Sequence, residues 1–363
     1  LEMGGLQVLI TFILPNFSGG GAERVVVNFI IGLHQQKVDV EIIVFNNNGP
    51  LVSDIPEGVT IHNLKTDTLR RSIFAIIGKL KSLNSRVIFS TFGYINVALL
   101  LFRFFLPKET KIWIREANLP SISLPNNPRA KLMNILYRLL YKKSDRLICT
   151  SERMKNEFIL DFFIPESIIT ILPNPTNTEM IKSSMFPIER FDNGGVCYVA
   201  SGRLTYQKGF DQLLKWFSAL NDKTATLVIL GDGDDKSKLI QQSNDLNIQD
   251  QVKFIGFCKN PWKWYAGADV FLLSSRWEGL SNVVLESLTC GTPVIATSES
   301  GGIAEIASQV KVGDLIVTST PSIFINEMLK VKPNPSKKMK VSLLPKIYNI
   351  KHSVSILERL MRY

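Results

Sequence analysis

The chain has 363 residues, of which 45% are apolar and 20% charged, with a net charge of +10. This length exceeds one ordinary hydrophobic core and predicts two domains of roughly 150 to 180 residues each in a folded globular protein. The four cysteines lie far apart with no C-x-x-C spacing. Neither a disulfide framework nor a zinc site is therefore indicated, and we expect a reducing, cytoplasmic setting.

The first half alternates apolar runs of strand length with segments of helical spacing. Residues 7–14 are predicted to form a strand, 19–21 a glycine loop and 22–33 a helix, which is how a doubly wound α/β domain opens. The loop is either a structural turn or a place where the backbone approaches a phosphate or an acceptor. Further strands are predicted at residues 86–90, 111–115 and 146–150.

Polar residues follow these strands at their carboxyl ends, where parallel α/β sheets bind ligands. They are residues 91–94, 115–118 and 150–152. We expect these three segments to line one crevice of the first domain.

The first half is also strongly basic. Fifteen basic and three acidic residues lie between Arg70 and Arg146. This imbalance indicates nucleic acid, an anionic membrane face or an anionic substrate, with solvated helix faces as the alternative. The longest apolar run, residues 95–106, contains Arg103 and is shorter than the ~20 residues needed to span a bilayer.

Residues 172–195 are rich in proline, serine and asparagine and are predicted to form a linker. The strand and helix alternation then restarts at residue 196 and continues to about residue 305. It predicts a second Rossmann-like half, with a cleft between the two halves. Beyond residue 310 the pattern weakens, and residues 346–363 are predicted to form a final amphipathic helix.

Two cations share a strand-to-helix loop of the second half. Arg203 offers a planar fork and Lys208 a compact ammonium, so together they can neutralise a departing diphosphate. Taken alone, such a pair is more often surface charge. Its position at a strand end favours the functional interpretation.

Two glutamates eight residues apart flank a predicted helix start. Glu278 comes just before the helix and Glu286 lies on it, so their carboxylates are separated by roughly 12 Å along the axis at ~1.5 Å per residue. The free backbone amides between them suit an anion. This arrangement fits the two hydroxyl-bearing ends and the anionic middle of a nucleotide sugar, and the alternative is a surface helix with two solvated glutamates.

Asp232 and Asp234 form an Asp-x-Asp after a predicted strand. Such a pair can bind a divalent cation, but a turn with a helix N-cap is the preferred interpretation because further ligands are lacking. The signatures of serine hydrolases, zincins and P-loop nucleotidases do not occur.

Taken together, five motifs resemble the retaining family 4 glycosyltransferases, which have the GT-B fold. They are G-G-G-A-E-R at residues 19–24, G-R-L-x-x-x-K-G at 202–209, G-D-G at 231–233, F-I-G at 254–256, and E-x7-E at 278–286 with G-T-P-V-I at 291–295. The resemblance implies an α/β protein whose two Rossmann-like domains, with parallel sheets, face each other across a cleft. It places the acceptor domain at residues 6–178, completed by the helix at 346–363, and the donor domain at 195–345.

The resemblance also implies roles for matching residues. Arg203 and Lys208 would hold the donor diphosphate and Glu278 the transferred sugar, and these three form the expected catalytic set. Glu286 would hold the ribose hydroxyls.

Other expected donor contacts come mainly from the main chain. Backbone amides of Leu280, Ser281 and Asn282 would touch the diphosphate, and the main chain near Phe257 would contact the base. Gly20 and Gly21 would approach the donor from the first domain. No metal and no cofactor is expected.

Many relatives carry a histidine in the acceptor crevice, where this chain has other residues. Tyr94 and Glu116 are the acceptor candidates here. Glu116 either orients an acceptor hydroxyl or forms a structural salt bridge with Arg115 or another arginine.

The sequence thus predicts a retaining hexosyltransferase that uses a UDP-sugar and extends a polyprenyl-diphosphate-linked glycan in surface polysaccharide or glycan assembly. It would lie peripherally on the cytoplasmic face of the inner membrane, with its basic first half on the anionic surface and no nucleic-acid partner. The alternatives are a GT-B synthase or phosphorylase with a soluble acceptor, or a basic nucleic-acid-binding protein.

Overall fold

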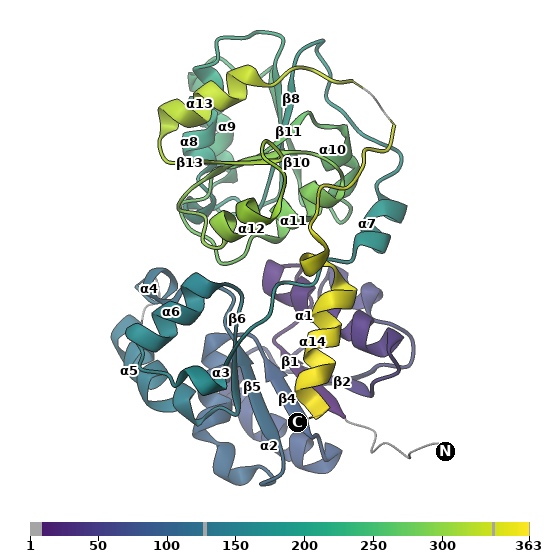
Figure 1. Cartoon of the computed structure of the whole chain (residues 1–363), viewed down its shortest axis with the longest axis vertical. Coiled ribbons are helices and arrows are strands. Elements are labelled where there is room, and N and C mark those ends of the chain that lie inside the picture. The colour runs from purple at the N-terminus through teal and green to yellow at the C-terminus, as the bar shows by residue number, and fades with distance from the viewer. Residues whose placement is uncertain (1–8, 126–128, 336–337, 363) are drawn as a thin grey trace. The chain divides into compact units, whose positions relative to one another are not determined.

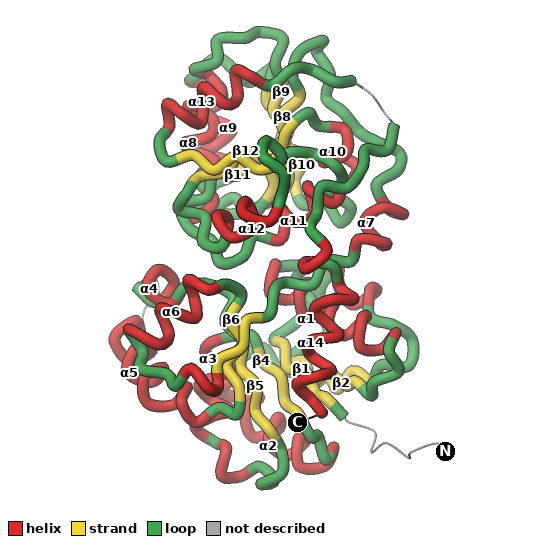
Figure 2. The backbone as a smooth tube through the Cα atoms, viewed as in Figure 1, coloured by secondary structure: helices red, strands yellow, loops and turns green. Residues whose placement is uncertain are grey.

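The computed structural model of the chain describes residues 9–125, 129–335 and 338–362. It divides into two compact units: unit 1 is Leu1–Pro175 with Ile350–Tyr363, and unit 2 is Thr176–Asn349. In each unit helices flank a central sheet (Figures 1 and 2). Within the described ranges, no helix is both long enough and apolar enough to cross a membrane.

Unit 1 contains a parallel sheet whose described strands run in the order β3-β2-β1-β4-β5-β6-β7. Crossing helices cover both faces, so the central strands are buried apolar runs, as parallel sheets require. The predicted strands are confirmed, although residues 7 and 8 of the first lie outside the described residues. The strands are β1 (Ile10–Leu14), β2 (Val40–Val44), β3 (Thr60–Asn63), β4 (Val87–Ser90), β5 (Lys111–Arg115), β6 (Arg146–Cys149) and β7 (Ile169–Ile171).

The helices of unit 1 pack into two core clusters. One cluster includes α1 (Gly21–Gln35) and α14 (Ile350–Arg362). The other includes α2 (Leu69–Leu83), α3 (Gly93–Leu101), α5 (Ala130–Leu140) and α6 (Glu152–Leu160). Shorter elements are α4 (Pro120–Ser123) and the 3-10 turns η1 (Pro50–Asp54), η2 (Arg103–Phe105), η3 (Tyr141–Lys143) and η4 (Glu166–Ile168).

The C-terminal helix α14 lies against α1 (Figure 1). A side chain at Gly32 would place its Cβ 2.5 Å from Val354 and 3.0 Å from Ile350, so glycine lets the two helices approach. Helix α14 buries Ile350, Val354 and Leu357 at helical spacing. The predicted final helix is therefore present, but it starts after a 3-10 turn, η6 (Lys346–Tyr348).

Unit 2 contains a second parallel sheet with the described strands in the order β10-β9-β8-β11-β12-β13. The alternation predicted from residue 196 onward is confirmed. The strands are β8 (Cys197–Ser201), β9 (Thr226–Leu230), β10 (Val252–Gly256), β11 (Val270–Leu273), β12 (Val294–Thr297) and β13 (Leu315–Thr318). The helices are α7 (Thr178–Ser184), α8 (Phe210–Ser218), α9 (Lys236–Asp245), α10 (Trp262–Gly267), α11 (Asn282–Thr289), α12 (Ile303–Gln309) and α13 (Pro321–Lys330), with the 3-10 turn η5 (Tyr206–Lys208).

Two parts of unit 2 differ from the sequence-based expectation. The expected linker contains α7, whose Ile181 lies in the core of unit 2 together with Met185 just after the helix. The segment after residue 310, where the sequence pattern weakens, contains β13 and α13. Phe324 and Met328 of α13 are buried. Both segments are short, and their secondary structure is stabilised by packing in unit 2 rather than by local sequence periodicity.

Candidate functional site

The predicted donor residues lie in loops at the carboxyl edge of the unit 2 sheet. Arg203 and Lys208 follow β8, Phe257 follows β10, and Glu278 lies between β11 and α11. Strands β8 and β11 are neighbours, so the Arg203–Lys208 loop and the Glu278 loop lie side by side. Ligands of open parallel sheets bind at this edge.

Lys208 and Glu278 form an ion pair through Nζ and Oε1. The same carboxylate oxygen accepts a hydrogen bond of 2.8 Å from the Ser275 hydroxyl, and Glu278 is only 7% exposed. The structure therefore brings the two predicted residues together. The sequence did not predict that they contact each other.

Hydrogen bonds from side chains to backbone carbonyls fix the positions of these two loops. The Gln212 amide donates to the Ser274 carbonyl at 2.7 Å, and the Ser274 hydroxyl donates to the Lys208 carbonyl at 3.0 Å. Gly209 has a φ of +66°, and a Cβ there would lie 2.1 Å from the Ser274 carbonyl oxygen. Glycine at 209 thus permits the close approach that places Lys208 beside Glu278.

A second link joins Arg276 to α8. Its guanidinium donates to both carboxylate oxygens of Asp211, at 2.8 and 2.7 Å, and lies 3.9 Å from the centroid of the Tyr206 ring. The hydrogen bonds from Arg276 lower the pKa of Asp211. A bidentate pair of this kind is rigid, and sequence reasoning missed it because the partners are 65 residues apart.

Besides Lys208, the N-terminus of α11 contributes partial positive charge at this edge of the sheet. Ser281 is buried at the N-cap position, and its hydroxyl has no hydrogen-bond partner among the described residues. A buried, unbonded hydroxyl at a helix N-terminus suits a bound anion. Arg203 is exposed on the neighbouring loop, and no described residue pairs with its guanidinium.

Glu286 lies on α11 and is 7% exposed. Its Oε2 accepts a hydrogen bond of 3.1 Å from the indole nitrogen of Trp262 on α10. This bond orients the buried carboxylate, and the sequence analysis did not identify Trp262. Phe257, the residue predicted near the base, is 54% exposed beyond the end of β10.

Asp232 and Asp234 lie before α9. The Asp232 carboxylate accepts from the Gly233 amide at 2.9 Å and pairs with Lys236 at 3.1 Å. Position 235, rather than 232 or 234, is the N-cap, and its side chain makes no capping bond. The turn is therefore present but the expected cap is wrong. No cluster of three His, Cys, Asp or Glu suited to a metal occurs in the described ranges.

The predicted unit 1 residues lie at the carboxyl edge of its own sheet. Gly20 is the N-cap of α1 and Gly21 its first residue, close to Glu23, which accepts a 2.9 Å bond from Ser18. Tyr94 lies in the first turn of α3, where burial and then the charge of Glu23 raise its pKa to about 12.

Glu116 follows β5 and is 6% exposed. Its Oε1 accepts hydrogen bonds from the Asn96 amide at 3.1 Å and from the Tyr141 hydroxyl, and Tyr137 donates a further bond. Burial raises the pKa of Glu116 to about 7, against the opposing effect of these bonds. The four-residue spacing of Tyr137 and Tyr141, which places two side chains on one helical face, is the signal that could have identified this cluster.

The alternative prediction for Glu116, a structural salt bridge with Arg115 or another arginine, is wrong. The Arg115 guanidinium instead donates to the Thr91 hydroxyl at 2.7 Å and to the Asn174 side-chain oxygen at 2.5 Å. No ion pair of Glu116 occurs among the described side chains. Arg115 thus ties the ends of β4 and β5 to the segment after β7.

Glu116→Gln is expected to remove a pH dependence from the stability of unit 1. The pKa of this carboxyl is 4.5 in the unfolded chain and about 7 in the folded protein, so the stabilisation is complete below pH 4.5 and lost as the pH rises through 7. The loss is up to about 3 kcal/mol. Hydrogen exchange of the β5 amides across this pH range measures it. The exposed Glu109→Gln should retain the slope, and a slope unchanged in Glu116→Gln would contradict the assignment.

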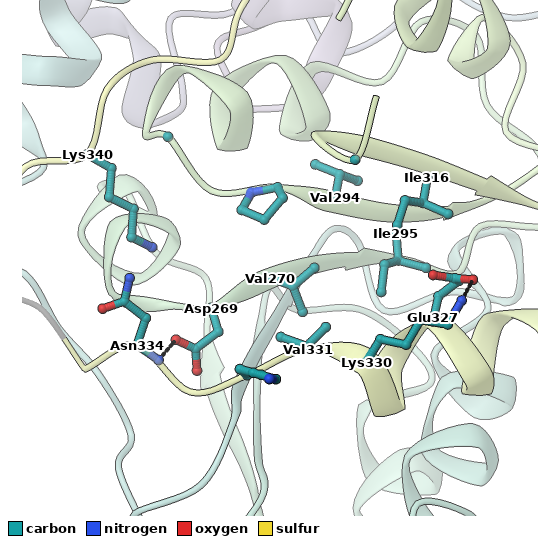
Figure 3. Close-up of a pocket in the computed structure, with 14 residues that line it drawn as sticks. Asp269, Val270, Val294, Ile295, Ile316, Glu327, Lys330, Val331, Asn334 and Lys340 are labelled. Atoms are coloured by element: carbon teal, nitrogen blue, oxygen red, sulfur yellow. Dashed lines mark hydrogen bonds and ion pairs between the residues drawn. The ribbon is translucent and has the colours of Figure 1, made fainter. Parts of the chain in front are cut away.

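A cavity of about 380 Å³ lies away from these residues. Val270 and Val294, which begin β11 and β12, are in its wall, so it is at the amino edge of the sheet (Figure 3). The backbone N–H of Asn334 donates to the Asp269 carboxylate there at 2.7 Å, and burial lowers the pKa of Lys340. None of the predicted donor residues is in its lining.

Two protein-family models match the chain. The model described as Glycosyltransferase Family 4 matches residues 19–180, and the model described as Glycosyl transferases group 1 matches residues 182–342. Together the two matches extend over most of both units.

Individual relatives give the same result. A Campylobacter jejuni protein named N-acetylgalactosamine-N,N'-diacetylbacillosaminyl-diphospho-undecaprenol 4-alpha-N-acetylgalactosaminyltransferase is 29% identical over 323 residues, 86% of each chain. An uncharacterised glycosyltransferase of Methanocaldococcus jannaschii is 34% identical over 222 residues, 58% of this chain and about half (54%) of that relative's length. The structure of Anabaena HepE with UDP and glucose covers 98% of this chain and 100% of its own, with 16% identity and a TM-score of 0.77. With the two parallel sheets, this likeness confirms the predicted GT-B fold.

Proposed function

The chain belongs to the glycosyltransferases, with a family 4 first half and a group 1 second half, and on this premise we propose its reaction. The protein transfers a hexose or N-acetylhexosamine from a UDP-sugar, with retention of the anomeric configuration, to a polyprenyl-diphosphate-linked glycan. The C. jejuni relative supports this proposal because its name describes transfer to a diphospho-undecaprenol glycan.

The observation that carries the proposal is the juxtaposition of Lys208, Glu278 and the α11 N-terminus. The diphosphate of the donor accepts hydrogen bonds from the amides of Leu280, Ser281 and Asn282 and from the Ser281 hydroxyl. Arg203 and Lys208 add positive charge, while Glu278 binds the sugar hydroxyls. Charge that develops on the diphosphate is thereby stabilised as the sugar leaves.

The nucleoside binds beside the diphosphate. Glu286, oriented by Trp262, accepts hydrogen bonds from the ribose hydroxyls, and the main chain near Phe257 contacts the base. The site needs no metal because two cations and a helix N-terminus already supply positive charge.

In the reaction, the bond between the anomeric carbon and the β-phosphate oxygen breaks. The acceptor hydroxyl attacks the same face of the sugar, and its proton passes to the departing phosphate oxygen. No side-chain base is required. The products are UDP and the extended glycan.

Unit 1 is proposed to bind the acceptor, with Tyr94 and Glu116 at the carboxyl edge of its sheet. The basic residues of the first half attract the anionic diphosphate and headgroups, each near-surface cation contributing about 1 kcal/mol. The enzyme therefore acts as a peripheral protein on the cytoplasmic face of the inner membrane.

A transfer assay tests the function. Each of a panel of UDP-sugars is incubated with a synthetic polyprenyl-diphosphate disaccharide, and the product is analysed by mass spectrometry and NMR. We expect one sugar to be transferred with an α-linkage from an α-linked donor, unaffected by EDTA. An inverted linkage, or no transfer from any UDP-sugar, would contradict the proposal.

A further inference from the structure

Four phenylalanine rings form a continuous row on unit 1, which we call the phenylalanine ladder. Its members are Phe74 on α2, Phe102 at the end of α3, and Phe104 and Phe105 in η2. Ring centroids lie 5.9 Å apart for Phe74 and Phe102, 6.1 Å for Phe102 and Phe105, and 4.1 Å for Phe104 and Phe105. Phe74 and Phe104 are nonetheless 71% and 75% exposed.

The core of unit 1 does not require the exposed rings of Phe74, Phe104 and Phe105, whereas Phe102 is partly buried against it. Helix α2 buries Ile73, Ile76, Ile77 and Leu80, whereas Phe74 points outward with Arg70 and Lys81 on the same face. Leu101 at the end of α3 is also half exposed. A contiguous apolar patch bordered by charged residues is a feature of interaction sites.

The charges around the ladder are mostly positive. Helix α2 carries four basic and no acidic residues, and between Thr68 and Lys111 the sequence has eight basic residues against Glu109 alone. The ammonium of Lys81 lies 5.7 Å from the Phe105 centroid. Of these cations, only Arg103 forms an ion pair with a described residue, Asp145 at 2.5 Å.

We propose that the phenylalanine ladder is the surface by which this protein docks on an anionic lipid bilayer. The exposed rings enter the boundary between headgroups and acyl chains, and the surrounding cations bind lipid phosphates. This inference rests on the proposed function, since a lipid-linked acceptor requires the enzyme to work at a membrane.

Other partners fit the ladder less well. A second copy would bring two cationic surfaces into one symmetric contact, where like charges repel. Single-stranded nucleic acid stacks on separate aromatic faces, whereas the Phe104 and Phe105 rings contact each other. An aliphatic neighbour such as Leu101 also favours hydrocarbon.

Vesicle flotation tests the proposal with the full chain. We expect binding to phosphatidylglycerol-containing vesicles, little binding to phosphatidylcholine alone, and at least about a tenfold loss of partitioning in Phe74→Ser/Phe104→Ser. Lys81→Glu should weaken binding mainly at low salt. Because these side chains are exposed, melting temperature and transfer to a short-chain, water-soluble acceptor should be unchanged.

The matched control is Phe163→Asn, which removes a phenylalanine that is 70% exposed outside the ladder. Asparagine suits its positive φ of 57°. Equal partitioning of the ladder variant and the wild type, or an equal loss in Phe163→Asn, would overturn the inference without affecting UDP-sugar transfer. Ladder-dependent dimers, or ladder-dependent binding of single-stranded RNA without vesicle binding, would also overturn it.

Discussion

Lys208→Met should lower kcat/KM for the UDP-sugar by about 10² to 10³. In the proposed reaction Lys208 stabilises negative charge that grows on the departing diphosphate, so its loss acts mainly on kcat. The substitution also leaves the buried Glu278 carboxylate with Ser275 as its remaining described hydrogen-bond donor. We therefore expect stability to fall as well, by roughly 1–3 kcal/mol, measured by urea unfolding.

A double variant separates these two effects. Lys208→Met/Glu278→Gln removes the unpaired charge, so stability should recover while turnover stays low. Lys215→Met on α8, away from the pair, is the matched control and should behave like the wild type. Wild-type turnover in Lys208→Met would contradict the role given to this lysine.

Glu286→Gln is expected to raise KM for the donor by about 10- to 100-fold. Glutamine retains an oxygen that can accept the hydrogen bond from Trp262, so the fold should be kept. The neutral amide, however, loses the charge-assisted bonds to the ribose hydroxyls. Steady-state kinetics with varied UDP-sugar measure this effect.

Two controls accompany Glu286→Gln. Glu299→Gln changes an exposed glutamate in the loop after β12 and should leave KM unchanged. Trp262→Phe keeps the charge but removes the orienting indole nitrogen, so a smaller rise in KM is expected. If Trp262→Phe affected KM more than Glu286→Gln, the carboxylate would be structural rather than the ribose ligand.

Much of the fold could be predicted from local sequence features. Buried parallel strands such as β1 and β9 are mainly apolar runs with one threonine each, followed by proline or glycine, and such runs are recognisable in the sequence. Helix α7 and the β13–α13 segment were missed because they are short and depend on the rest of unit 2 for burial. Thr320 caps α13 directly before Pro321, and this pair is a local sequence feature from which the start of the helix could have been predicted.

The sequence allowed individual residues to be proposed for the candidate site, but it did not predict which side chains contact them. The motifs led to the prediction of Lys208, Glu278 and Glu286 as site residues, whereas the residues that contact them come from other parts of the chain. Trp262 and Asp211 have no local signature, because only the packing of α10 and α8 brings them to Glu286 and Arg276. Similarly, neighbouring basic residues suggested a salt bridge for Glu116, yet folding surrounds it with Asn96 and two tyrosines.

Calorimetric titration with UDP tests most directly the claim that unit 2 holds a nucleoside diphosphate at the α11 N-terminus. The wild type should bind UDP, and Lys208→Met and Glu286→Gln should each weaken the affinity by at least about tenfold, or 1.4 kcal/mol. Glu299→Gln should match the wild type. Equal affinity in all four proteins, or no binding of UDP by the wild type, would contradict the account.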